Sequence, residues 1–244
     1  MLRQTHVEDV SHVRALLDRM REELRAPRAG AVSGFDVIGM LSGWSHDLIL
    51  NAHLERSTQY SHWLALALGC CAEDARQIRI GGMLHDIGKV AVREAVLLKT
   101  GPLTPEETAE MRRHAVIGAK MIEPLRCSIV VAPIVAAHHE RWDGLGYPRG
   151  LSGTAIPLGA RIVSAVDGFD AMSSDRPYRS ALPRHEVVQR MREGRGTQWQ
   201  PEVVDALLEL VGRGVFDGAR PVEPEAEPSR PARSIRPGRV IRVA

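Results

Sequence analysis

The sequence contains few cysteines and few aromatic residues. Two of its three cysteines, Cys70 and Cys71, are adjacent and the third is Cys127, so no disulfide framework is present and we expect a reducing compartment. Aromatic residues make up 4% of the 244 residues, whereas alanine, leucine, valine and isoleucine are abundant. This composition favours packed helices over a β-sandwich. An apolar share of 44% is enough to bury a core.

Long apolar runs are also missing. The longest apolar stretches, residues 31–50 and 128–137, are too interrupted or too short to span a bilayer. The first residues include Arg3 and Glu8 in place of the apolar run of a signal peptide. We therefore expect a soluble, cytoplasmic protein without a membrane span.

The net charge is small and unevenly distributed. It is +2 in total, and residues 220–244 alone contribute +3 through six arginines and three glutamates, so the rest carries −1. Five prolines in the same stretch oppose helix and compact folding. A solvated tail explains this composition better than an arm for acidic lipid or nucleic acid, so no nucleic-acid partner is expected. The predicted organisation is an N-terminal helix and linker over 1–34, one domain over 35–214 and a Pro/Arg-rich disordered tail over 215–244.

Helical periodicity dominates the chain before the tail. Helices are predicted over 8–26, from near Phe35 to Leu50, and over 53–69, 73–88, 105–122, 128–140, 159–173, 183–194 and 201–212. A loop is expected from Gly88 to Glu107, with Thr104 capping the helix that begins at Pro105. Neither β alternation nor an internal repeat is visible, so the predicted fold class is all-α, a helical bundle.

Five of the ten histidines lie late in predicted helices or in flanking polar positions. These are His53, His85, His114, His138 and His139, and the carboxylates that accompany them are Asp86 and Asp167. "IGGMLHDIGK" and "IVVAPIVAAHHE" carry imidazole and carboxylate out of strongly apolar segments, where such groups need a partner such as a metal. Successive candidates lie 24 to 32 residues apart, the length of a helix and its connection. This spacing suits a bundle in which each helix delivers one ligand to a shared centre.

The residue types indicate which metal chemistry to expect. Imidazoles and carboxylates without thiolate disfavour structural zinc and suit iron or manganese. Seven side chains are too many for one ion, and a carboxylate such as Asp86 can bridge two ions in the arrangement that hydrolyses phosphate esters. The spacing therefore favours a metallohydrolase, and a helical domain without a metal is the alternative.

Three segments carry a family resemblance. "HDIGK" at 85–89, "HHERWDGLGYP" at 138–148 and "DGFDAMSSDRPYR" at 167–179 resemble the HD-GYP family of the HD phosphohydrolase superfamily. His53 with Arg56, "KTGPLTPEE" and His114 with Gly118 fall between them in the expected order, and the match covers about residues 36–210. The resemblance implies an all-α bundle that hydrolyses the bacterial second messenger cyclic di-GMP at a centre of two or three ions. It also implies that the seven residues above are the metal ligands.

The same resemblance implies roles around the metal centre. Lys89, one turn after Asp86, would bind the scissile phosphate and assist the leaving oxygen, so these two residues are the expected catalytic pair. Arg176 and Arg179 would hold substrate phosphates, for which a guanidinium is suited. The turn of Gly146, Tyr147 and Pro148 would form part of the wall of the substrate groove. In the family this surface is also linked to contact with diguanylate cyclase domains.

Several positions depart from the family pattern. Ile49 stands where three-ion members carry a glutamate, which favours two ions and accumulation of linear pGpG, with slow conversion to GMP. Ser57 and Gly168 replace usual apolar residues and predict slightly looser packing, and Gln200 replaces a usual aspartate. The predicted helix over 8–26 would serve packing or formation of a homodimer. A catalytically weak module that binds the nucleotide or a cyclase, and an HD hydrolase of another nucleotide, are the alternative functions.

Overall fold

The computed structural model describes residues 48–97, 99–123, 128–175 and 180–216. The predicted helix over 8–26, residues 35–47 and the part of the predicted tail from 217 onward lie outside these ranges. The predicted start of the tail at 215 is wrong, because Val215 and Phe216 pack against the larger apolar core. In chain order the elements are α3 (Leu48–Ala67), α4 (Ala72–Leu84), the 3-10 helix η1 (Ile87–Ala91), α5 (Glu94–Leu97), α6 (Pro105–Arg112), α7 (His114–Ile122), α8 (Ser128–Ala137), η2 (Gly153–Ala155), α9 (Leu158–Ser173), α10 (Arg184–Glu193) and α11 (Pro201–Gly212). Within the described ranges there is no strand and β pairing is limited to isolated bridges, such as that between Arg195 and Trp199, so the all-α prediction is confirmed.

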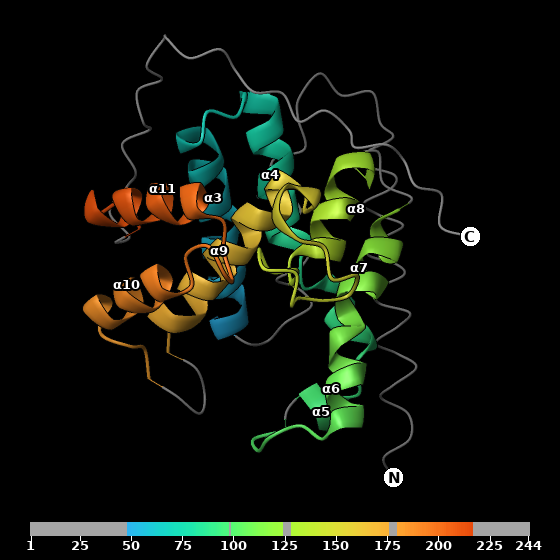
Figure 1. Cartoon of the computed structure of the whole chain (residues 1–244). Helices are drawn as coiled ribbons and strands as arrows, with labels where there is room; N and C mark the ends of the chain where they lie inside the picture. The colour runs from blue at the N-terminus through green and yellow to red at the C-terminus, as the bar shows by residue number, and fades with distance from the viewer. Residues whose placement is uncertain (1–47, 98, 124–127, 176–179, 217–244) are drawn as a thin grey trace.

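Helices α3 and α9 run through the middle of the molecule (Figure 1). α10 and α11 lie on one side of them, and α7 and α8 lie on the other, with α4 between α3 and α8. The larger apolar core joins α3, α4, α9, α10 and α11, and a smaller one joins α4, α7 and α8. α4 contributes to both cores, and its C-terminal end lies near the ends of α7 and α8.

Local chemistry sets the helix ends. After α3, Gly69 adopts a φ of 79°, and the amides of Gly69 and Cys70 donate to the carbonyls of Leu66 and Ala65. This is a Schellman ending, which needs a residue that tolerates positive φ. At the start of α6, Thr104 and Glu107 form the predicted capping box, which is confirmed.

Several predicted boundaries are wrong. α3 is continuous from Leu48, so the break expected between residues 50 and 53 is absent. The helix predicted over 73–88 ends at Leu84, and the loop expected after it contains η1 and α5. The helix predicted over 105–122 is two helices that meet at Arg113. The helix predicted over 128–140 ends at Ala137, which leaves both histidines of the "HH" step beyond its last turn.

The looser packing predicted at Gly168 and Ser57 is also wrong. A Cβ on Gly168 would lie 2.6 Å from Cζ2 of Trp199, so glycine makes room for the buried indole. Ser57 is fully buried where α3 crosses α4, and a Cβ on Gly82 would lie 2.8 Å from its carbonyl oxygen. Small residues therefore permit close approach at both positions.

Candidate metal centre

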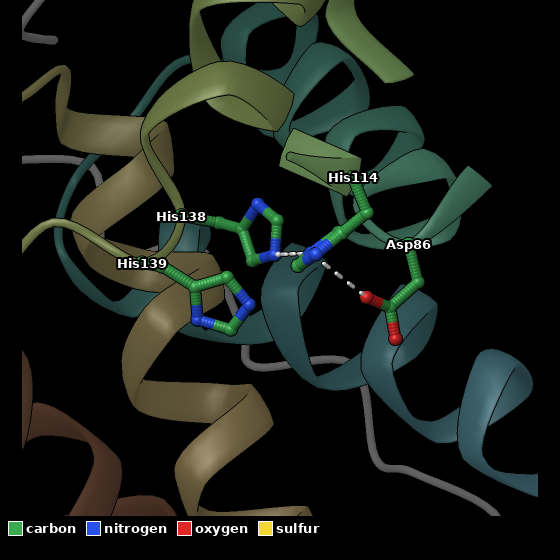
Figure 2. Close-up of side chains that lie close together, drawn as sticks. All are labelled: Asp86, His114, His138 and His139. Atoms are coloured by element: carbon green, nitrogen blue, oxygen red, sulfur yellow. Dashed lines mark hydrogen bonds and ion pairs between the residues drawn. The ribbon is translucent and has the colours of Figure 1, made fainter. Parts of the chain in front are cut away.

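The ends of three helices meet beside α3 and α9. His85 and Asp86 follow the last turn of α4, His138 and His139 follow the last turn of α8, and His114 opens α7. Figure 2 shows Asp86, His114, His138 and His139 pointing toward one another. His53 comes from α3 and Asp167 from α9. The structure thus brings together all seven predicted ligands, which span more than a hundred residues of sequence.

The seven residues divide into two groups that share one carboxylate. One potential ligand atom from each of Asp86, His114, His138 and His139 lies within 4.8 Å of the others, and the same holds for His53, His85 and Asp86. Oδ1 of Asp167 lies 3.7 Å from Nε2 of His53 and 3.9 Å from Nε2 of His85. Asp86 is therefore placed between two clusters that could each hold an ion.

Three imidazoles are oriented by the helices that precede them. Nδ1 of His85, His114 and His138 each donates to the backbone carbonyl three residues earlier, those of Gly82, Met111 and Val135, at 2.7 Å. Each acceptor lies in the last turn of its helix, where carbonyls lack partners within the helix. With Nδ1 protonated, a neutral ring carries its lone pair on Nε2, and this tautomer suits a metal ligand.

The Nε2 atoms test whether a metal fits here. Nε2 of His114 and Nε2 of His138 are 3.2 Å apart, so two lone pairs face each other in these tautomers. Nε2 of His85 is buried without a well-formed hydrogen bond and lies 3.4 Å from Oδ2 of Asp86 and 3.9 Å from Oδ1 of Asp167. Neighbouring ligands of one ion, each at about 2.1 Å, also lie about 3 Å apart. A cation reconciles both observations, so the residues fit a metal centre.

In the metal-free protein the pKa values of the proposed histidine ligands shift in opposite directions. Burial lowers the pKa of His139 to about 4 and lowers that of His138 well below its usual value, so both are neutral at pH 7. Burial would also lower the pKa of His85, but the carboxylates of Asp86 and Asp167 outweigh it and raise that pKa to about 9. Burial likewise opposes ionisation of Asp86, yet Lys89 and His85 hold its pKa well below the usual value.

Lys89 lies beside the shared carboxylate, as the i+3 spacing predicts. Its Nζ donates to Oδ2 of Asp86 at 2.6 Å. Between these two residues, Gly88 lets η1 approach α7 closely, because a Cβ there would lie 2.0 Å from the carbonyl oxygen of His114. Glycine at position 88 therefore allows η1 to pack against α7, which places Asp86 and Lys89 close to His114.

Comparison with known proteins agrees with this arrangement. The family model of the HD domain matches residues 44–203. The chain belongs to the HD-domain family. It is 35% identical over 213 residues to a cyclic di-GMP phosphodiesterase of Thermotoga maritima, an alignment that covers 86% of this chain and 58% of that protein. It is 44% identical over 160 residues to a cyclic di-GMP phosphodiesterase response regulator of Xanthomonas campestris, covering 65% of this chain and 42% of that one.

Two further matches bear on fold and substrate. A 3′3′-cGAMP-specific phosphodiesterase of Vibrio cholerae is 35% identical over 160 residues, covering 65% of this chain and 31% of that protein. A solved structure described as an HDG"Y"P protein of Bdellovibrio bacteriovorus matches with a TM-score of 0.55 at 17% identity, covering 82% of this chain and 63% of that one. The structural match shows the shared fold, and together these relatives confirm the HD-GYP resemblance. The chain spans about half the length of the curated relatives it matches.

The loop over residues 140–151, directly after the two histidines, is held by hydrogen bonds to a buried side chain. The buried carboxylate of Glu140 accepts hydrogen bonds from the amides of Arg149 and Leu151 at 2.7 and 3.0 Å. The amide of Tyr147 donates to the carbonyl of His139, and a Cβ on Gly146 would lie 2.3 Å from the amide nitrogen of Arg141. Glycine at 146 and a buried acid at 140 therefore hold the turn directly against the metal-site segment.

Tyr147 connects this loop to the centre. Its ring stacks on the imidazole of His139 with centroids 4.8 Å apart, and the guanidinium carbon of Arg112 lies 5.0 Å from its ring centroid. Pro148 follows it through a cis peptide bond. The three predicted groove residues Gly146, Tyr147 and Pro148 therefore lie next to the cluster of ligands, with an arginine of α6 above them.

Two predicted residues fall outside the described ranges, and other residues at the site were not predicted. Arg176 and Arg179 lie outside the described residues. Asp170, Glu140 and Arg112 were not predicted to serve the site. A signal for Asp170 exists in the sequence, because it stands three residues after Asp167 and so shares a helix face with it. Glu140 and Arg112 act through contacts between distant segments, for which the sequence gives no local pattern.

The described helices include none that is long and apolar enough to cross a bilayer.

Proposed function

We propose that this HD domain is a metal-dependent phosphodiesterase that opens cyclic di-GMP to linear pGpG. The observation that carries the proposal is the placement of Asp86 between two groups of ligands, in one of which the Nε2 atoms of His114 and His138 face each other at 3.2 Å. The names of the relatives from Thermotoga maritima and Xanthomonas campestris support the cyclic dinucleotide as substrate. Retention of all seven ligand types and of Lys89 argues against a module that only binds.

We infer that the centre holds two divalent ions, iron or manganese. His53, His85, Asp86 and Asp167 would hold one ion, and Asp86, His114, His138 and His139 the other. Imidazole and carboxylate ligands without thiolate suit these metals. When bound, such ions supply charge neutralisation for the phosphodiester and a nucleophile at neutral pH.

The protein's own residues position the substrate. Lys89 holds its ammonium group 2.6 Å from the shared carboxylate, where it can donate a hydrogen bond to the scissile phosphate or to the departing 3′ oxygen. Tyr147, stacked on His139 with the guanidinium of Arg112 over its ring, would form part of the wall beside the scissile phosphate. The role of Arg176 and Arg179 in gripping the phosphates stays a prediction from the sequence.

Purification without air, followed by metal analysis and chromatography of the products of cyclic di-GMP, tests the proposal. The parent should contain two ions per chain and produce pGpG. His85→Ala and Asp86→Ala should each abolish hydrolysis and lower bound metal, since both residues are proposed ligands. Unchanged metal content and turnover in either variant would refute the site assignment.

A second substrate deserves the same assay, because one relative is named for 3′3′-cGAMP. This cyclic dinucleotide differs from cyclic di-GMP in one base and shares the phosphodiester chemistry. Faster turnover of 3′3′-cGAMP than of cyclic di-GMP would reassign the substrate and leave the metal centre intact.

Contact with a diguanylate cyclase domain through the turn at 144–148 stays a prediction. Leu145 is 80% exposed at the tip of this turn, as a contact residue would be. A homodimer through residues 8–26 also stays a prediction, since that segment lies outside the described residues.

A further inference from the structure

Asp170 is a buried acid beside the proposed metal centre. It is 1% exposed, and it lies on α9 one turn after Asp167. Its Oδ2 accepts a hydrogen bond from Nδ1 of His53 at 2.6 Å. A carboxylate this deeply buried needs partners, and those of Asp170 come from α3 and from the residue that ends α9.

Arg56 and Ser174 hold this carboxylate in position. Nε of Arg56 donates to Oδ1 of Asp170, and Nη2 donates to Oδ2 at 3.2 Å. Oγ of Ser174 donates to Oδ1 at 3.3 Å. A two-pronged guanidinium contact fixes the plane of a carboxylate. Arg56 therefore aims Oδ2 at His53, which stands three residues earlier on the same helix.

The Nδ1 atom of His53 donates to a different kind of acceptor from that used by three of the other proposed histidine ligands. His85, His114 and His138 use the neutral carbonyls at the ends of their preceding helices. His53 lies inside α3, where carbonyls are engaged in the helix, so its ring is oriented by an acid from another helix. An imidazole that donates to a carboxylate is a stronger metal donor than one that donates to a carbonyl.

We propose that Asp170 is a positioning residue that sets the affinity of only one of the two metal positions. Its bond to Nδ1 leaves Nε2 of His53 directed to Asp167, 3.7 Å away, and thus to the group that contains His85. Among the described residues, the hydrogen bonds of Asp170 join it to His53, Arg56 and Ser174, and none joins it to His114, His138 or His139. The inference rests on the proposed two-ion centre, and it predicts that the two positions respond differently to a change at Asp170.

Titration of Mn²⁺ into metal-free protein tests the inference, with Asp170→Asn as the variant. Asparagine keeps the size of the side chain and removes its charge. The affinity of one of the two ions should fall about 10- to 100-fold, the usual effect of losing such a partner. The affinity of the other ion should stay within a factor of two of the parent, since its ligands are untouched.

Two control variants separate positioning from general damage. Ser174→Ala removes a bond to the same carboxylate but keeps the bond to His53, so both affinities should remain. Asp205→Asn removes an exposed acid that pairs with Arg195 at 2.7 Å. Asp205 lies on α11, which carries none of the proposed ligands, so neither affinity should change.

The possible outcomes are distinguishable. Two unchanged affinities in Asp170→Asn, or an equal loss of both ions, would overturn the inference, the second result marking Asp170 as a general structural residue. Failure of the parent to bind Mn²⁺ at two positions would instead overturn the proposed metal centre. A melting curve of the metal-free variant shows whether an equal loss reflects a destabilised fold.

Discussion

Nε2 of His114 and Nε2 of His138 lie 3.2 Å apart, while both Nδ1 atoms donate to backbone carbonyls. In neutral rings these two Nε2 atoms are acceptors, so neither can satisfy the other. The backbone at two helix ends therefore holds two lone pairs in a buried arrangement that is unfavourable without a cation. The fold itself prepares the site for a positive ion.

Removal of divalent ions should destabilise the protein. Ligands that bind only the folded state add about 2.7 kcal/mol when present at a hundred times their dissociation constant. We expect the melting temperature to fall on treatment with a chelator and to recover with Mn²⁺. The measurement is a thermal melt followed by circular dichroism. An identical melting temperature with and without chelator would contradict the prediction.

Metal affinity should rise with pH between about 7 and 9. The carboxylates of Asp86 and Asp167 outweigh the effect of burial and raise the pKa of His85 to about 9, so below that pH an ion must displace a proton from this ring. As the pH rises toward 9 this competition disappears, and affinity should increase by up to about tenfold per pH unit. His139, with a pKa lowered to about 4 by burial, does not compete in this range. Competition with a chelator of known affinity measures the effect, and a flat profile would count against it.

Gly88→Ala should damage both stability and the metal site. The added Cβ would lie 2.0 Å from the carbonyl oxygen of His114 and 2.5 Å from the amide nitrogen of Gly118, and backbone cannot move aside cheaply. Overpacking typically costs about 1–3 kcal/mol, and a backbone clash belongs at the upper end. Denaturant unfolding and metal content both measure the outcome. Gly101→Ala is the matched control, because nothing lies within 4 Å of its Cβ position and it should behave as the parent.

The sequence predicted the helical class, and the "HD" and "HH" steps that end apolar segments gave a strong local signal for His85, Asp86, His138 and His139. Spacing and the HD-GYP resemblance added His53, His114 and Asp167, which the structure gathers with them. It did not predict the division between α6 and α7. Arg113, at the junction, has φ −67° and ψ −18°, close to helical values, and the sequence has no glycine or proline there to mark the division. The effect of Gly168 on packing was predicted wrongly because this glycine makes room for the indole of Trp199, thirty-one residues further along the chain. Contacts between distant segments, including that of Asp170 with His53, have no signature in local spacing.

Gln200→Asp should stabilise the protein by about 1 kcal/mol. Arg161 is largely buried, and burial lowers the pKa of its guanidinium, while its Nη1 donates to Oε1 of Gln200. Nε of Arg161 is buried without a hydrogen bond. A carboxylate would turn a neutral contact into a charge-assisted one. The bond from Gln200 to Glu202 would be lost, which limits the gain.

The gain should depend on charge and therefore on pH. The guanidinium of Arg161 would lower the pKa of the introduced carboxyl, so its contribution is present above about pH 4 and is lost as the pH falls through the lowered value. Gln200→Asn has the same length without the charge and is the control. Equal stability of the two variants at pH 7 in urea unfolding would show that charge at this position has no effect.

We expect the reaction product to depend on position 49. Helix α3 runs without interruption through residues 49 and 53, so the two positions lie one turn apart. A glutamate at the first could add a ligand to the group that contains His53, whereas isoleucine has no atom that binds a metal. With two ions, the linear product must be released and bound again with fewer contacts to its new terminal phosphate.

Linear pGpG should therefore accumulate while GMP forms slowly, and time-resolved chromatography of the reaction measures both. Ile49→Glu is the informative variant: it should bind an additional ion and shorten the lifetime of pGpG, because the glutamate supplies the missing carboxylate. Hydrolysis of cyclic di-GMP itself should change little, since that step needs only the two ions that the existing ligands hold. Release of GMP by the parent as fast as the cyclic substrate disappears, or three ions in the parent, would show that isoleucine at 49 does not limit the reaction.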